Sequence, residues 1–255
     1  MRETQFPVIS LGSEKPDAPA AAELSKWIAD QRGKTADLTS FELETTLAKQ
    51  GENVSEPCAA GGFYADRMKK ALGITGDRLP EECTLSFDEI SADLDRLLKI
   101  RRQFRCALPL SCIKPAAFSD EAQENYAAAL KSLCRFMRDR GAAGHVFCGE
   151  PAETILEFAR GPKYIWVCEA EDFETLLETT STLVCTAADI KLVEELNETY
   201  LIRKVLVKDA DRTAMERLLE TFDADRLCCA GIAPALEPGD YWKSLADVTA
   251  RLTDK

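Results

Sequence analysis

The sequence predicts an α/β fold, specifically a (β/α)8 TIM-like barrel whose N-terminal half is incomplete or irregular. In the C-terminal half, short apolar runs rich in Val, Ile and aromatic residues alternate with helical stretches at a regular interval. No glycine-rich dinucleotide loop follows any of these runs. The alternation indicates parallel β/α units, and the absence of that loop favours a barrel over a Rossmann sheet.

The strands of the C-terminal half are the most regular feature of the pattern. Each is a short apolar run, as is typical of strands buried on both faces. We expect strands at 145–148, 164–168, 181–185, 202–208 and 226–229.

The helices between these strands are defined by caps and by apolar spacing. Asp211 is a suitable N-cap for a helix whose apolar face repeats at helical intervals, and Asp189 begins another. Shorter helices are expected at 154–160 and 173–178. The expected buried positions of the two longer helices are Met215, Leu218, Leu219 and Phe222, and Ile190, Val193 and Leu196.

The first half of the chain is less regular. Residues 6–12 and 106–112 indicate strands, 83–87 is a weak additional strand, and 51–62 has the composition of a loop. Helices are expected at 20–30, 40–50 and 88–103. A long helix capped by Ser119 should bury Tyr126, Leu130, Leu133 and Met137. We expect one domain over 1–255.

Composition excludes several classes of partner. The 255 residues include 32 Lys and Arg against 44 Asp and Glu, a net charge of −12. No basic stripe interleaves with aromatic residues, so nucleic acid and anionic membrane surfaces are not expected partners. There is no 18-residue apolar run and no signal-peptide pattern at the start, so we expect a cytoplasmic protein.

Ten cysteines are many for a cytoplasmic chain. A reducing compartment argues against a disulfide framework, and the absence of any CxxC excludes zinc ribbons and thioredoxin-like motifs. Several cysteines end expected strands, on the face where β/α barrels build their sites. They are Cys112, Cys148, Cys168, Cys185 and the pair Cys228 and Cys229. The alternative is that these thiols are small buried apolar side chains.

The sulfur-rich strand ends suggest a zinc site that keeps one position open for a substrate. The candidate ligands are His145, Cys148, Cys168 and Cys229. Side chains three apart on a regular strand point to opposite faces, so His145 and Cys148 can share a metal only if the strand bends.

Two further sites remain open. One is a Cys148–His145 dyad oriented by Glu150, which meets the same difficulty. The other is Lys208, at the end of its strand, which could form a Schiff base or could be a solvated lysine beside Asp209.

Four segments resemble the superfamily of uroporphyrinogen decarboxylase and cobalamin-independent methionine synthase, in its zinc-dependent, thiol-activating methyltransferase branch. The opening strand and helices over 6–50 are similar to the start of a methionine-synthase barrel. "GHVFCGE" resembles the end of the strand that carries an HxCG motif. "DRLCCAGIAPALEPGDYWKSLADVTARL" resembles the final strand with its CGIxP motif, and "YIWVCEAEDFETLLE" the strand that carries a zinc-binding Glu.

The resemblance implies a methyltransferase that activates a small thiol on zinc. It places Cys148 at the HxCG cysteine, with His145 one residue out of register, and Ala230 at the CGIxP cysteine, directly after Cys229. Cys168 or Glu169 falls at the position of the zinc-binding Glu. Glu150 and Glu169 would orient the ligands. A corrinoid such as methylcobalamin, supplied by a corrinoid protein, or a methylated folate would be the methyl donor.

Two alternatives depart from this function. The chain is short for that superfamily and its metal motif is shifted. The first alternative is therefore an accessory barrel that has lost the chemistry and binds a corrinoid or tetrapyrrole. The second is an unrelated β/α barrel whose cysteines are structural.

Overall fold

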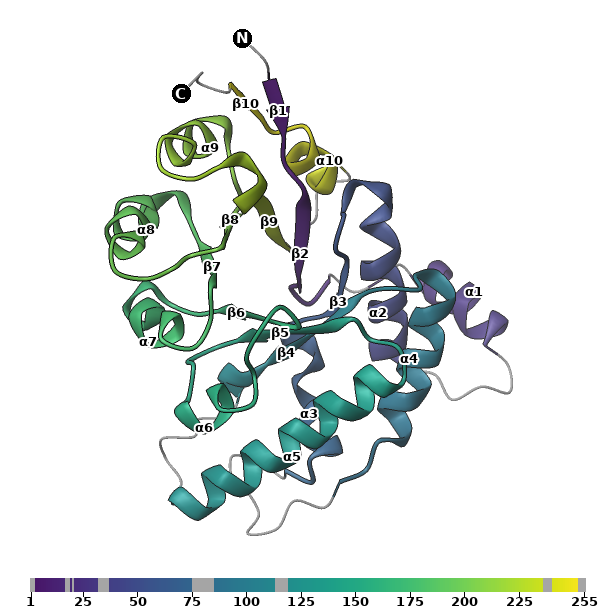
Figure 1. The fold of residues 1–255 in the computed structure, drawn as a ribbon. Helices are drawn as coiled ribbons and strands as arrows, with labels where there is room; N and C mark the ends of the chain where they lie inside the picture. The colour runs from purple at the N-terminus through teal and green to yellow at the C-terminus, as the bar shows by residue number, and fades with distance from the viewer. Residues whose placement is uncertain are drawn as a thin grey trace.

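Two parallel sheets of four strands each form the centre of the molecule (Figure 1). The computed structural model describes residues 3–16, 19, 21–31, 37–74, 85–112, 119–235 and 240–251. The first sheet has the order β2 (Val8–Ser13), β9 (Leu227–Ala233), β8 (Lys204–Lys208), β7 (Thr182–Cys185). The second has the order β3 (Cys58–Ala60), β4 (Arg105–Pro109), β5 (Gly144–Cys148), β6 (Tyr164–Val167).

The two sheets meet along both edges. At the β2–β3 edge, isolated parallel bridges join Ile9 to Glu56 and Ser13 to Gly61, and the Ser10 amide donates to the Glu56 carbonyl over 3.0 Å. At the other edge, β6 and β7 lie in close contact. The chain ends also meet, because β1 (Glu3–Gln5) pairs antiparallel with β10 (Thr249–Arg251) (Figure 1).

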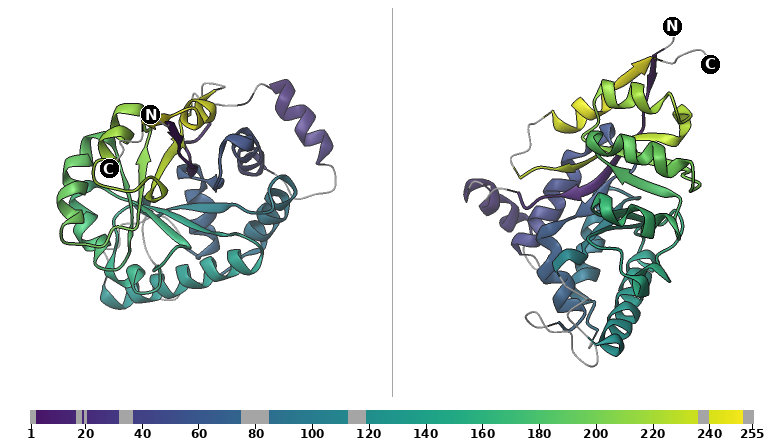
Figure 2. Two further views of the ribbon diagram at one scale, coloured as in Figure 1. Left: turned by 45° about the horizontal axis from the view of Figure 1, so that its top comes forward. Right: turned by 90° about the vertical axis from the view of Figure 1, so that its left-hand side faces the viewer.

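Helices lie outside the two sheets (Figures 1 and 2). In chain order, the helices of the described residues are α1 (Ala21–Asp30), α2 (Leu38–Lys49), α3 (Ala65–Ala71), α4 (Asp88–Ile100), α5 (Asp120–Asp139), α6 (Glu153–Leu156), α7 (Phe173–Leu177), α8 (Ile190–Asn197), α9 (Arg212–Leu218) and α10 (Tyr241–Ala246).

The buried side chains form two cores. The larger core lies between the strands and the helices. The smaller one, here called the inner core, takes side chains from all the strands of both sheets. It consists of Ile9, Leu11, Cys58, Ala107, Val146, Ile165, Val184, Leu206, Cys228 and Ala230. Because strand side chains alternate in direction, the inner-core residues define one face of each strand, the inner face.

Most expected elements are confirmed. The five strands of the C-terminal half and those expected at 6–12 and 106–112 are present, with ends shifted by a few residues. Asp211 caps α9 by accepting from the Ala214 amide over 2.8 Å, and Ser119 caps α5. The four side chains expected to be buried on α5 are all buried.

Three expectations about the fold need correction. The described residues confirm an α/β fold with parallel sheets. They do not confirm the closed (β/α)8 barrel, because their parallel strands form two four-stranded ladders. The stretch expected to be a loop, 51–62, contains β3, whose three small residues lie between Pro57 and Gly61 and give no strand signal. In the weak strand at 83–87, residues 83 and 84 lie outside the described residues, and 85–87 are not a strand.

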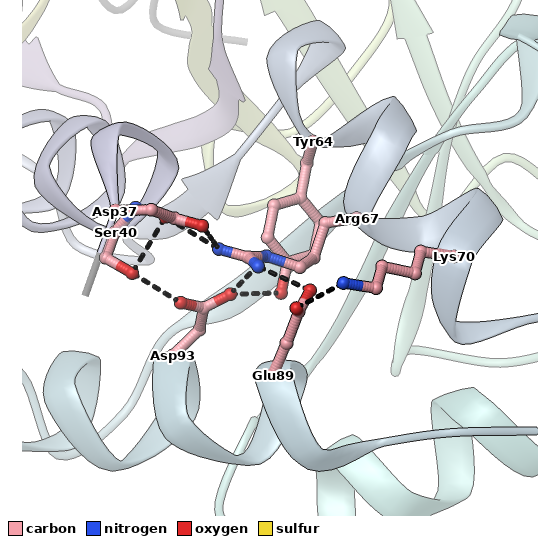
Figure 3. Close-up of polar contacts among 7 residues, drawn as sticks. All are labelled: Asp37, Ser40, Tyr64, Arg67, Lys70, Glu89 and Asp93. Atoms are coloured by element: carbon pink, nitrogen blue, oxygen red, sulfur yellow. Dashed lines mark hydrogen bonds and ion pairs between the residues drawn. The ribbon is translucent and has the colours of Figure 1, made fainter. Parts of the chain in front are cut away.

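The outer helices α2, α3 and α4 are tied together by a buried ionic cluster (Figure 3). The Arg67 guanidinium, whose side chain is 9% exposed, lies 2.8 Å from Asp37, 2.6 Å from Glu89 and 3.1 Å from Asp93. Asp93 also accepts hydrogen bonds from the hydroxyls of Ser40, at 3.0 Å, and Tyr64, at 3.1 Å. Each buried charge therefore has a partner, as burial of charge requires.

Candidate functional site

The amino ends of the strands carry an ion cluster around Glu56, which together with Arg105 also lines a cavity of about 570 Å³. Arg105 donates to Glu56 Oε2 over 2.9 Å, and Lys204 Nζ lies 3.1 Å from Glu56 Oε1. Burial alone would raise the pKa of the Glu56 carboxyl. Its hydrogen bonds to Arg105 and Lys204 and their charges outweigh burial and hold that pKa below its ordinary value. The charged side chains of Glu56, Arg105 and Lys204 at this end are thus paired with one another.

The carboxyl ends present a lysine without such a partner. One face of β8 carries every second residue of the strand: Lys204, Leu206 and Lys208. This is the inner face, because Leu206 belongs to the inner core. Lys208 is half-buried and forms no ion pair or hydrogen bond with any described residue. Its positive charge acts on the Cys148 thiol, which packs against the inner core.

The backbone changes direction directly after Lys208. Asp209 has a φ of 51°, in the left-handed region that is costly for most residues other than glycine. Its amide donates to the Ala230 carbonyl over 2.8 Å, and its carboxylate accepts from the Tyr241 hydroxyl over 2.6 Å. These contacts hold the turn, and so fix where the Lys208 side chain leaves the strand.

Two cavities open at this end, with volumes of about 560 and 430 Å³. Cys148 and Ser111 line both of them. Cys148 is therefore at the boundary between the cavities, within electrostatic reach of Lys208.

The larger cavity is acidic. Its wall carries four carboxylates together with Cys168: Glu150, Glu169, Glu171 and Asp172. Burial and the neighbouring charges of Glu150, Glu171 and Glu169 raise the pKa of Asp172. Mutual repulsion therefore makes this cavity unfavourable for an anion.

The smaller cavity, here called the Ser13 cavity, has a different lining. It is lined by Ser13, Glu14, Lys15, Gly61, Gly62, Ser111 and Cys148, together with apolar side chains. The Ser13 hydroxyl is buried and has no hydrogen-bond partner among the described residues. Glu14 accepts from the Ala235 amide over 3.1 Å. Sequence reasoning missed this cavity, although the pair Gly61-Gly62 directly after an apolar stretch was a signal for it.

His145 is not part of this site. Its ring is fully buried on the outer face of β5 and stacks against both Phe147 and Tyr164, whose rings also contact each other. Nε2 lies 3.0 Å from the Cys134 carbonyl, so it carries the proton. Burial lowers the pKa of His145 to about 3. His145 and Cys148 thus point to opposite faces of β5, so they form neither a catalytic dyad nor a shared metal site.

The other expected metal ligands divide between two regions. Cys148 and Cys168 line the acidic cavity, and the expected orienting residues Glu150 and Glu169 line it with them. Cys229 is buried in the core between strands and helices. Burial raises the thiol pKa of Cys148 to about 11 and of Cys168 and Cys229 to about 12, so these sulfurs are protonated at neutral pH.

The zinc prediction is corrected on this geometry. Within the described ranges, no three His, Cys, Asp or Glu side chains gather closely enough to hold a metal ion. His145 and Cys229 lie on the outer faces of their strands, toward the helices, whereas Cys148 packs against the inner core. The donor set predicted from the strand ends therefore does not fit zinc.

The cysteines mostly act as small core residues. Nine lie in the described part of the chain, all free, and six of these are buried: Cys58, Cys106, Cys134, Cys185, Cys228 and Cys229. The tenth, Cys83, lies outside the described residues. None of the helices that the structure describes is long and apolar enough to cross a membrane. The cytoplasmic location stays a prediction.

Comparison with known proteins identifies no family. No family model matches the chain, and no curated protein matches it. Among solved structures, it is similar to a putative dihydrodipicolinate synthase family protein from Coccidioides immitis, at 13% identity and a TM-score of 0.36. The match covers 89% of this chain and 60% of that protein, so this chain spans about 60% of its length.

These findings correct the family expected from the sequence. Membership of the uroporphyrinogen decarboxylase and methionine synthase superfamily is corrected, because no family model matches the chain and the described residues do not form the zinc site that the resemblance implies. The expectations of a methyltransferase, of a corrinoid or methylated folate and of a thiol substrate rested on that resemblance. The expectation of zinc rested on it and on the strand-end cysteines, which do not gather into a metal site within the described residues.

Proposed function

We propose that the carboxyl ends of the strands form an enzyme active site that binds a small carbonyl compound as an imine on Lys208. One observation carries the proposal: Lys208 lies on the inner face of β8 at its carboxyl end, half-buried, and its amine forms no ion pair or hydrogen bond with any described residue. Its charge acts on the Cys148 thiol, which lines both cavities. A lysine amine without a carboxylate partner is available to a ligand.

The chemistry requires only the lysine and the substrate. The lone pair of neutral Lys208 Nζ attacks the carbonyl carbon, and the carbonyl oxygen becomes a hydroxyl. Protonation of that hydroxyl by solvent and its loss as water leave a protonated C=N bond, an iminium, in place of C=O. The resulting iminium withdraws electrons from the neighbouring carbon, which favours proton abstraction or carbon–carbon bond cleavage there.

Cys148 supports this step as a hydrogen-bond donor. Its thiol is protonated at neutral pH because burial raises its pKa to about 11. A protonated thiol is a poor nucleophile but can donate to the oxygen of a carbonyl or carbinolamine. We therefore assign the covalent bond to Lys208 and a positioning contact to Cys148.

We infer that the two sheets form one barrel-like wall around this site. The inner core is shared by all the strands of both sheets, and the sheets meet at both edges. An experimental structure in which β6 and β7 stand much farther apart than the usual ~5 Å strand spacing would contradict this inference.

Reductive trapping tests the proposed function. Borohydride transfers a hydride to the iminium carbon and converts the imine to a stable secondary amine. The modified lysine then gains the mass of the carbonyl compound less one oxygen atom, and peptide mass spectrometry locates it. Pyruvate and hydroxyacetone are suitable first probes because both are small ketones.

Lys204 provides the internal control. It lies on the same face of the same strand but is ion-paired with Glu56 at the amino end. We expect modification of Lys208, saturating at one site per chain, with Lys204 unmodified and trapping lost in Lys208→Met. Equal labelling of Lys204 and Lys208, or labelling only in proportion to the exposure of each lysine, would overturn the proposal.

A further inference from the structure

The cavity of about 570 Å³ at the amino ends of the strands, here called the amino-end cavity, has a basic lining. Its wall is formed by the segments that lead into β3, β4 and β5. Three arginines, Arg101, Arg102 and Arg105, line it against one carboxylate, Glu56. The whole chain carries a net charge of −12, so the charge of this lining is opposite in sign to that of the protein.

The one carboxylate is already shared between two cations. Glu56 Oε2 accepts hydrogen bonds from Arg105 Nε over 3.1 Å and from Arg105 Nη2 over 2.9 Å. Its other oxygen, Oε1, lies 3.1 Å from Lys204 Nζ. Glu56 therefore cannot also neutralise Arg101 and Arg102, and the basic character of the cavity is not cancelled from within.

Arg105 forms a fixed part of the wall. Besides its bonds to Glu56, it donates to the carbonyls of Pro162, over 3.0 Å, and Lys163, over 3.1 Å. A Cβ atom at Gly144 would lie 2.6 Å from Arg105 Nη1 and 2.3 Å from the Lys163 carbonyl oxygen. Glycine at position 144 is thus what lets this guanidinium cross β5 and reach both carbonyls.

Arg101 and Arg102 keep unused donors. Arg101 is anchored through Nη2, which donates to the carbonyls of Gly51 and Val54, while its Nε and Nη1 donate to no described residue. Arg102 is exposed, and its side chain forms no ion pair or hydrogen bond with any described residue. The cavity therefore presents one anchored and one free guanidinium, each with N–H groups available to a ligand.

The helix that precedes these arginines accounts for only part of their charge. Arg101 directly follows α4, and a basic residue there offsets the negative end of the helix dipole. That end is equivalent to about half a negative charge. Three arginines against one carboxylate leave a net charge of +2 in the lining, so most of this charge is available to an external anion.

We propose that the amino-end cavity binds a small ligand that carries a multiply charged oxyanion, such as a phosphate ester or a polycarboxylate. Guanidinium groups match both kinds of oxyanion, because two parallel N–H groups can donate to two oxygens. Arg102 and the free nitrogens of Arg101 donate to the oxyanion, and Arg105 contributes charge from the wall. The volume lies within the range of about 300–1,000 Å³ that is usual for small-molecule sites.

Calorimetric titration of the full chain with pyrophosphate and with citrate tests this site. We expect saturable binding of one anion per chain. Arg102→Gln should raise the Kd by about 10- to 100-fold, the usual range for a hydrogen bond to a charged group. Arg102→Lys keeps the charge but loses the planar fork, so its Kd should lie between the two. Tighter binding of pyrophosphate indicates a phosphate ligand, and tighter binding of citrate a polycarboxylate.

Arg203→Gln is the matched control. Arg203 is exposed, directly precedes β8 and has no side-chain partner among the described residues, but it does not line the cavity. Its replacement removes the same charge and should leave both Kd values unchanged. Equal weakening by Arg102→Gln and Arg203→Gln would mean general attraction to basic side chains and would overturn the site, as would the absence of saturable binding of either anion.

A further variant separates this site from the proposed imine. Lys208 lies at the opposite end of β8 and does not line the amino-end cavity, so Lys208→Met should bind both anions as wild type does. Anion binding that is lost in Lys208→Met and kept in Arg102→Gln would place the anion at the carboxyl ends and refute this proposal. Failure of ketone trapping at Lys208 would leave it intact, because the two sites share no residue.

Discussion

Lys204 and Lys208 lie on the same face of β8, yet only Lys204 has a carboxylate partner. Lys204 Nζ is 3.1 Å from Glu56, whereas Lys208 pairs with no described residue. One strand thus carries a lysine paired with Glu56 at its amino end and, at its carboxyl end, a lysine whose amine pairs with no described residue. This contrast underlies the functional proposal and makes the two lysines natural controls for each other.

The two lysines should differ in their effect on stability. We expect Lys204→Met to lower the free energy of unfolding by about 1 kcal/mol, because it removes a partner of the partly buried Glu56. Lys208→Met should leave it unchanged or raise it, because it removes no ion pair or hydrogen bond to a described residue. Urea denaturation of the two variants at pH 7 checks this. A larger loss for Lys208→Met would mean that Lys208 is structural.

Replacement of the two serines of β2 by alanine should affect the free energy of unfolding differently, because the Ser10 hydroxyl has a hydrogen bond within the protein and the Ser13 hydroxyl has none among the described residues. Ser13→Ala removes a buried, unpaired hydroxyl and should stabilise the protein or leave it unchanged. Ser10→Ala removes the acceptor of the Gly12 amide and should cost about 1 kcal/mol. Thermal denaturation measures both. Destabilisation by Ser13→Ala comparable to that of Ser10→Ala would show that the Ser13 hydroxyl also has a hydrogen bond within the protein.

His145 should make stability depend on pH in a window where carboxylates contribute little. Its pKa is about 3 in the folded protein against an ordinary 6.5, so only the unfolded chain binds the proton in between. Its contribution is complete above pH 6.5 and is lost as pH falls, at about 1.4 kcal/mol per pH unit. Between pH 7 and 5.5, wild type should lose about 1 kcal/mol more than His145→Gln. Parallel pH profiles for the two proteins would contradict this account.

The ionic cluster of α2, α3 and α4 should be sensitive to loss of its central cation. Arg67→Met leaves Asp93, which is 2% exposed, without its charged partner, and should cost about 3–5 kcal/mol. Lys70→Met is the control, because Lys70 pairs with the same Glu89 but has a 70% exposed side chain. We expect a change below about 1 kcal/mol for Lys70→Met. Denaturant midpoints that shift equally for both would show that burial of the cluster is unimportant.

The sequence predicted the fold best where spacing alone determines structure. The strands of the C-terminal half and the caps Asp211 and Ser119 are present because apolar periodicity and capping are local properties. β3 was missed because three small residues bounded by Pro57 and Gly61 carry no periodicity, and its pairing with β4 is non-local.

Four of the site residues taken from strand ends, Cys148, Cys168, Glu150 and Glu169, line one cavity of the described structure. Their functional roles stay predictions. Which face a residue occupies separates Cys148 from His145 and Cys229, and the family resemblance could not supply that information. Ser13 was overlooked because its distinguishing property, a buried hydroxyl with no partner, exists only in three dimensions.

Borohydride trapping with pyruvate, followed by peptide mapping, tests the central claim most directly. The account predicts one modified lysine per chain at Lys208, with Lys204 unmodified and no label in Lys208→Met. Absence of label at Lys208 under saturating pyruvate, in folded protein, would contradict it.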